Sequence, residues 1–176
     1  RASQNWEILA TEIERLLEAR TQRASAAHNG KKVQLVRSAE EAEAMKGGGR
    51  YLVQPPLVAR DAALLENALK SLGVSSVVAC REPVTSLGMC PIVALGSGVT
   101  VRVQVEEPDN AQKPTCAWFD AAIEELGNHV IEQLNATTTE QRQLDYLLAH
   151  LSAIPTHVAT YRAAIERCNT LTHQSV

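Results

Sequence analysis

The chain has 176 residues, of which 45% are apolar and 21% are charged, and its formal net charge is −3 at pH 7. These values support one sizeable hydrophobic core and exclude a globally disordered chain. No apolar run approaches the roughly 18 residues of a membrane span, and clustered cations and aromatic side chains are few, so neither a membrane nor a nucleic acid is expected as a partner.

The four cysteines are spread along the chain and form neither a C-x-x-C pair nor a zinc-ligand pattern. We therefore expect a reduced, intracellular protein with small buried thiols and with no metal or other cofactor. The first residues show no signal-peptide pattern, so no targeting segment is expected.

The first predicted element is an amphipathic helix over residues 5–21, in which apolar side chains recur at helical spacing from Trp6 to Leu17. We expect this helix to pack on its own domain. The pattern then predicts, in chain order, strand 32–37, helix 39–45, a glycine turn at 47–49, strand 51–53, helix 62–72 and strand 75–80.

The middle of the chain has the clearest local signals. Asp61 is predicted to cap the helix that follows it. A Gly-Ser-Gly hairpin at 96–98 joins a predicted strand at 91–95 to a strand at 99–105, where every second residue is valine.

The C-terminal part is predicted to be helical, and Pro155 separates its last two helices. Its expected features are a helix that begins after Thr115 and ends near Gly127, a further turn capped by Asn128, a capping box formed by Thr137 and Glu140, a helix carrying Leu144 to Leu151, and a last helix over 156–167.

This order of elements predicts an α/β fold with a small central, mainly parallel sheet flanked by helices. We expect three parts: an N-terminal amphipathic helix and linker at 1–30, an α/β core at 31–128, and a C-terminal helical hairpin at 129–176 that packs on the core.

None of the common catalytic motifs is present, so an enzyme is not expected. A triad of Ser152, His157 and Asp145 would require two helices to bring the three side chains together, and the spacing does not demand it. Arg81 and Glu82 follow a predicted strand, at the kind of sheet edge where α/β proteins often bind ligands.

The segment from residue 51 to 127 resembles BRCT domains. Residues 51–53 and 65–73 are similar to the first strand and first helix of that family. Residues 84–87 resemble its V-T-H-L strand, with Ser86 in place of the usual histidine, and residues 118–123 resemble the W-φ-x-x motif of its last helix, where φ is apolar.

The resemblance implies a three-layer BRCT-like fold with Trp118 as the core anchor. It also implies a protein-interaction or scaffold module in a nuclear or chromosome-associated assembly, with a phosphorylated protein as a candidate partner. In such a site Gln54 would stand where the family has Ser or Thr, and the expected phosphate-binding cations are Arg60, Arg102 and Lys113.

Two other hypotheses remain open at this point. The chain could be a small α/β ligand-binding domain or enzyme with its site at the strand carboxyl ends near Arg81. It could also be a structural assembly subunit that docks through the helix carrying Trp6 or through the hairpin at 139–168. A location in the nucleus is expected, with the cytoplasm as the alternative.

Overall fold

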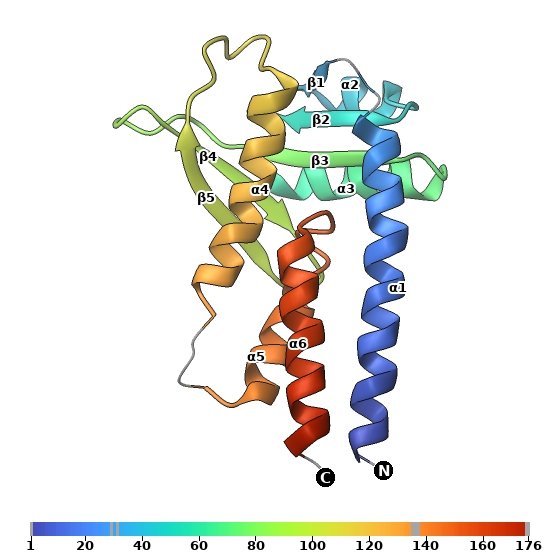
Figure 1. Cartoon of the computed structure of the whole chain (residues 1–176). Coiled ribbons are helices and arrows are strands. Elements are labelled where there is room, and N and C mark those ends of the chain that lie inside the picture. The colour runs from blue at the N-terminus through green and yellow to red at the C-terminus, as the bar shows by residue number, and fades with distance from the viewer. Residues whose placement is uncertain (1, 29, 31, 135–137, 175–176) are drawn as a thin grey trace.

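The computed structural model describes residues 2–28, 30, 32–134 and 138–174. It shows an α/β fold, as predicted, in which one sheet has helices on both faces (Figure 1). A bundle of three further helices, which includes the first and the last helix of the chain, extends away from the sheet layer (Figure 1).

The sheet has five strands that follow one another in chain order: β1 (Val33–Val36), β2 (Gly49–Val53), β3 (Ser76–Arg81), β4 (Met89–Leu95) and β5 (Thr100–Glu106). The pairs β1–β2 and β2–β3 are parallel, whereas β3–β4 and β4–β5 are antiparallel. The prediction of a mainly parallel sheet is therefore wrong for β4 and β5, and the sheet is mixed. The segments that connect β3 to β4 and β4 to β5 are shorter than the crossover of about a dozen residues that a parallel pair needs.

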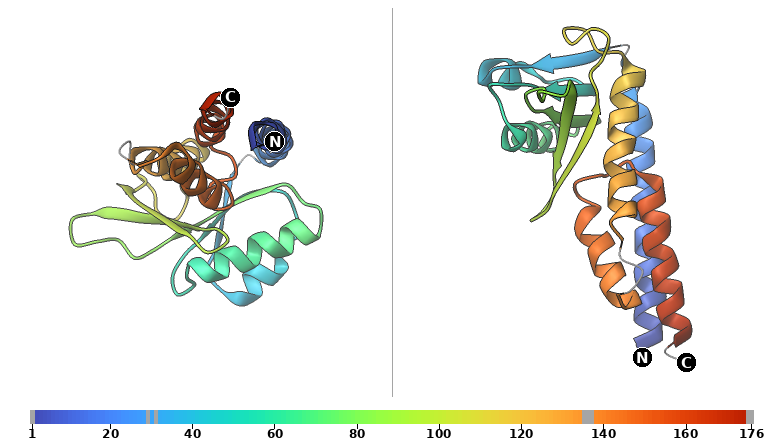
Figure 2. Two further views of the ribbon diagram at one scale, coloured as in Figure 1. Left: turned by 90° about the horizontal axis from the view of Figure 1, so that it is seen from below. Right: turned by 90° about the vertical axis from the view of Figure 1, so that its left-hand side faces the viewer.

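The two faces of the sheet are covered by different helices. Helices α2 (Ala39–Ala44) and α3 (Ala59–Ser71) lie on one face, and α4 (Cys116–Glu132) lies on the other (Figure 2). Because side chains alternate along a strand, neighbouring residues join different cores. The core under α4 includes Leu52, Ala79, Ile92, Phe119 and Leu126, and the core under α3 includes Tyr51, Val53, Cys80, Leu65 and Leu69.

The bundle consists of α1 (Ala2–His28), α5 (Glu140–His150) and α6 (Val158–Gln174). Helix α1 packs along α6, and the bundle has a core of its own around Ile13, Leu147 and Tyr161. Helix α1 is longer than the predicted 5–21, because the fully buried Ala27 continues its packing into the core under α4.

Several predicted helix ends differ from the structure. The cap residue of α3 is Val58 and not Asp61. Asp61 lies three residues after Val58, and its carboxylate accepts a hydrogen bond from the Val58 N–H at 2.7 Å. Helix α4 continues through Gly127 and Asn128 to Glu132. Thr115 caps α4 as predicted. Helix α5 is capped by Thr139, and the predicted capping residue Thr137 lies outside the described residues.

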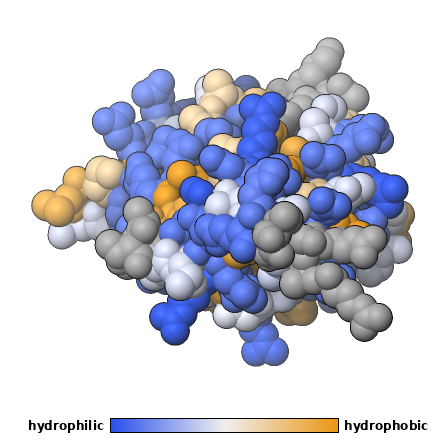
Figure 3. All heavy atoms as spheres, turned by 60° about the horizontal axis from the view of Figure 1, so that its bottom comes forward, coloured by the Kyte–Doolittle hydropathy of each residue, from blue (hydrophilic) through white to orange (hydrophobic). Residues whose placement is uncertain are grey.

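Only some of the residues that resemble BRCT domains lie in the kind of element that the resemblance implies. Residues 51–53 and most of 65–73 lie in β2 and α3. Residues 84–87, however, lie in the β3–β4 loop, where the Leu87 side chain is 86% exposed. Figure 3 shows an apolar group at the far left, where this loop projects, on a face that is otherwise largely polar.

Trp118 is not the central core residue that the resemblance implied. It is only partly buried and packs against the core under α4 from the side, where its indole N–H donates to the Glu106 carbonyl at 3.0 Å. The neighbouring Phe119 is 1% exposed. Because successive helical residues point about 100° apart, Trp118 and Phe119 cannot both face the sheet directly.

Candidate anion-binding site

Three polar side chains follow or end the three parallel strands at the same edge of the sheet. Val36 is aligned with Val53 and Val53 with Cys80, so Arg37, Gln54 and Arg81 occupy equivalent places on β1, β2 and β3. The carboxyl ends of parallel strands are where open α/β sheets most often bind ligands.

These side chains also share one face of the sheet. Leu52 and Ala79 contribute to the core under α4. Gln54 lies two residues after Leu52, and Arg81 lies two residues after Ala79, so both face the same side of the sheet as these core residues. The Arg37 Nε donates to the Gln54 Oε1 at 3.1 Å, which places Arg37 beside Gln54. We call Arg37, Gln54 and Arg81 the edge cluster.

Gln54 is the most buried member of the edge cluster, with 4% of its surface exposed. Its backbone N–H donates to the Val36 carbonyl at 2.9 Å and extends the β1–β2 ladder by one residue. Its side-chain Nε2 is buried and has no hydrogen-bond partner in the part of the chain that the structure describes. Exchanging the amide oxygen and nitrogen would place a donor against the Arg37 Nε, so the orientation with a free Nε2 is the favourable one.

Arg81 is the second member with unused donors. Its Nε and Nη1 atoms are buried and donate to no acceptor among the described residues. A buried donor that lacks an acceptor costs about 1–3 kcal/mol, and more when it is charged. Two adjacent strands thus end in side chains whose donors would gain from an acceptor.

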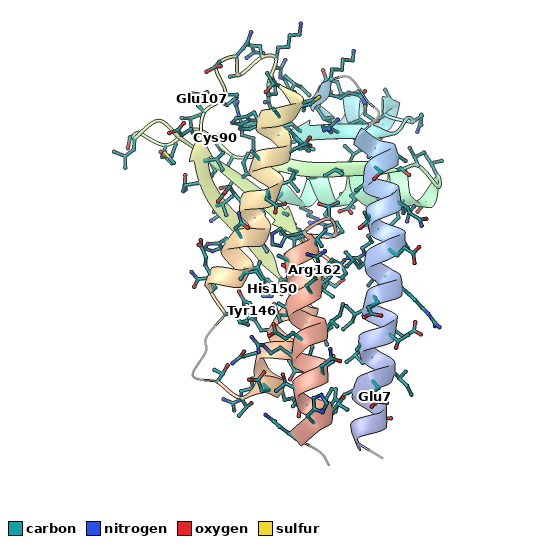
Figure 4. All side chains as sticks on the ribbon, viewed as in Figure 1. Glu7, Cys90, Glu107, Tyr146, His150 and Arg162 are labelled. Carbon is teal, nitrogen blue, oxygen red and sulfur yellow. The ribbon has the colours of Figure 1, made fainter. Side chains whose placement is uncertain are left out.

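The Cys90 thiol lies on the same face of the sheet as Arg81, because Cys90 precedes Ile92, the strand partner of Arg81, by two residues. Burial raises the pKa of Cys90 to about 11, and the positive charge of Arg81 acts in the opposite direction. Glu107 also raises this pKa, and Figure 4 places Cys90 and Glu107 at the same end of β4 and β5. At neutral pH the thiol is protonated, so this cysteine does not supply a nucleophile to the edge cluster.

The segment of residues 107–115 between β5 and α4, which we call the strap, contains Gln112. The Gln112 Oε1 accepts a hydrogen bond from the Arg37 Nη2 at 2.5 Å. The strap also carries Glu107 and Asp109, whose side chains are exposed. The edge cluster therefore combines two guanidinium groups and an amide donor under a polar strap, which suits an oxygen-bearing anion.

Of the four residues predicted to bind phosphate, one lies in the edge cluster and three do not. Gln54 lies in the edge cluster, whereas Arg60 is exposed on α3, on the opposite face of the sheet. Arg102 also points away from the α4 face and pairs with Glu82 at 2.8 Å. Lys113 is exposed on the strap, next to Gln112. The sheet itself separates Arg60 and Arg102 from Gln54, because alternate residues of a strand face opposite sides.

The cations that do accompany Gln54 are Arg37 and Arg81. Arg81 is predicted to follow a strand, and in the structure it is the last residue of the central strand β3, at its carboxyl end. The sequence pattern predicts Arg37 as the last residue of a strand and does not identify it as a site residue. Its signal in the sequence was its position directly after an apolar strand, which it shares with Gln54.

The hypothetical triad is not assembled. The Ser152 Oγ accepts a hydrogen bond from the Ser97 N–H at 2.8 Å, in the β4–β5 hairpin. The ring of His157 is bonded to Thr160 and Asn128. The hydrogen bonds given for Ser152 and His157 go to residues outside the hypothetical triad, so the structure does not show the relay that a triad needs.

Over the described ranges, no group of three or more His, Cys, Asp or Glu side chains is arranged to hold a metal ion. No described helix is both long and apolar enough to cross a membrane. No protein-family model, curated protein or solved structure matches this chain.

Proposed function

We propose that this chain is a protein-interaction module that binds a phosphate group carried by a partner protein at the edge cluster. The observation that carries the proposal is the set of buried donors on Gln54 and Arg81 that have no acceptor within the described residues. A phosphate offers three acceptor oxygens and about two negative charges, which suit these donors and the guanidinium groups of Arg37 and Arg81.

The chemistry of the cluster supports binding and names no reaction. Its members donate hydrogen bonds, and the nearby Cys90 thiol is protonated at neutral pH because its pKa is raised to about 11. The proposal is therefore of a binding module and not of an enzyme.

A distant relation to BRCT domains is part of the proposal, supported by the order β2, α3, β3 and by the place of Trp118 and Phe119 on α4 beside the sheet. The antiparallel strands β4 and β5 and the loop at 84–87 count against it. The phosphate site consequently rests on the edge cluster alone. A nuclear, chromosome-associated setting is proposed only together with the family relation.

The experiment is a binding screen with matched phosphorylated and unphosphorylated peptide libraries, followed by titration of the peptides that bind. We expect phosphorylated peptides to bind, and Arg81→Met to abolish that binding while leaving the free energy of unfolding unchanged or raised. The variant removes buried donors that lack acceptors, and an apolar replacement of similar shape is nearly neutral or stabilising.

Arg102→Met is the matched control, because it removes an exposed cation on the opposite face of the sheet. It should bind as the unchanged protein does. Equal binding of phosphorylated and unphosphorylated peptides, or a binding loss as large in Arg102→Met as in Arg81→Met, would refute the proposal.

A further inference from the structure

The donors of the edge cluster are buried, so a ligand can reach them only if part of the molecule moves. The unpaired nitrogens of Gln54 and Arg81 belong to strands in the middle of the sheet, with β1 on one side and β4 and β5 on the other. The strap lies next to this edge, because its Gln112 accepts a hydrogen bond from Arg37.

The path of the strap follows from its two ends. It leaves β5, which is one edge strand, and Gln112 contacts Arg37, which follows β1, the other edge strand. Its middle is a turn, in which the Lys113 N–H donates to the Asn110 carbonyl at 3.0 Å and the Gln112 N–H donates to the Asn110 Oδ1 at 2.9 Å. Figure 1 shows this loop arching from the end of β5 to the start of α4. The turn of the strap lies next to Gln54, because Arg37 bonds both to Gln112 on the strap and to Gln54.

The strap is fixed at its ends and lightly held in its middle. Pro108 and Pro114 are buried, and Thr115 accepts a hydrogen bond from the Trp118 N–H at 3.1 Å. Between the prolines, the bond from Arg37 to Gln112 is the one side-chain hydrogen bond that joins the strap to the sheet layer among the described residues. Breaking it would release the turn at 110–113 from the sheet layer, while the bonds from the Gln112 and Lys113 N–H groups to Asn110 keep the turn itself intact.

We propose that residues 109–113 form a lid over the edge cluster, held closed by the Arg37–Gln112 hydrogen bond and opened when a phosphate oxygen replaces the Gln112 Oε1 at Arg37. This inference rests on the proposed function and adds its regulation. When the phosphate oxygen replaces the Gln112 Oε1, Arg37 keeps one hydrogen bond. The ligand also accepts hydrogen bonds from the donors of Gln54 and Arg81, which have no acceptor in the closed state. Gln112 thus competes with the ligand in the closed state.

The test uses inorganic phosphate as the probe and two variants of opposite effect. Gln112→Ala removes the latch and should raise the affinity for phosphate by about three- to tenfold, which is the range of one hydrogen bond. Gln112→Glu replaces it with an ion pair to Arg37 and should lower the affinity by at least as much. Hydrogen exchange of the backbone amides at 109–113 should accelerate in Gln112→Ala and, in the unchanged protein, on addition of phosphate.

Gln104→Ala is the control, because Gln104 is exposed on β5 and alternates with Val103 and Val105, which face the core under α4, so it lies on the opposite face of the sheet from the edge cluster. If phosphate binds in a manner that depends on Arg81 but both Gln112 variants have unchanged affinity and exchange, the lid is refuted and the binding function stands. If phosphate binds to neither the unchanged protein nor Gln112→Ala, the proposed function fails and the lid with it.

Discussion

The imidazole ring of His157 occupies the space in which a side chain on Gly127 would stand. A Cβ built on Gly127 would lie 1.9 Å from the Cγ of His157, which is far inside van der Waals contact. His157 is fully buried and is bonded through Nδ1 to the Thr160 Oγ1 at 2.7 Å and through Nε2 to the Asn128 Oδ1 at 3.3 Å. This contact joins α4, which covers the sheet, to the start of α6 in the helical bundle.

Gly127→Ala is expected to lower the free energy of unfolding by about 3 kcal/mol, because the methyl group would displace a buried ring. The sign is informative, since alanine in an open helix interior is about 1 kcal/mol more favourable than glycine. Denaturant unfolding measures the change. Gly47→Ala is the control, because nothing lies within 4 Å of a Cβ at that position. A Gly127→Ala protein as stable as the unchanged one would show that the ring is not packed there.

The burial of His157 predicts a dependence of stability on pH. Burial lowers the pKa of His157 below its ordinary 6.5, and the exposed Glu124 opposes this in part. Because the unfolded chain takes up the proton first, the stabilising contribution is complete above pH 6.5 and declines as the pH falls from there through the lower pKa of the folded state.

The measurement is the free energy of unfolding between pH 7.5 and 5 for the unchanged protein and for His157→Gln. The amide cannot titrate, so the decline in this interval should be smaller in the variant. Identical pH profiles would contradict the assignment of the effect to His157.

The two adjacent aromatic residues of α4 should differ in their contribution to stability. Phe119→Ala removes a fully buried ring and is expected to cost about 3–5 kcal/mol. Trp118→Ala removes a partly buried indole and should cost less than half as much. Thermal and denaturant unfolding of the two variants compare them directly, and a larger loss for Trp118→Ala would restore the indole as the core anchor.

Gln54→Glu is expected to fill the edge cluster with an anion from the chain itself. The new carboxylate would lie beside Arg37 and on the strand next to Arg81, so it should raise the melting temperature and lower the affinity for phosphate at least tenfold. Gln104→Glu makes the same change of charge at an exposed position and should alter neither quantity. Stronger phosphate binding by Gln54→Glu would contradict the site.

Part of the edge cluster could be predicted from the sequence. Gln54 and Arg81 could be placed at strand ends because an apolar run stops directly before each of them. Their relation to Arg37 could not, since it depends on how Val36, Val53 and Cys80 align across two strand pairs. Strand alignment is set by distant contacts and not by the local residue pattern.

The local pattern by itself determined most helices and strands, the hairpin at 96–98, the cap at Thr115 and the helix break at Pro155. These follow from short-range sterics and from apolar periodicity, which act within one element. Only the tertiary structure decided that β4 runs antiparallel to β3, that Phe119 and not Trp118 is fully buried, and that Gly127 continues a helix beneath His157. Each of these depends on which residues from distant parts of the chain fill the same space, and packing between elements overrides local preference there.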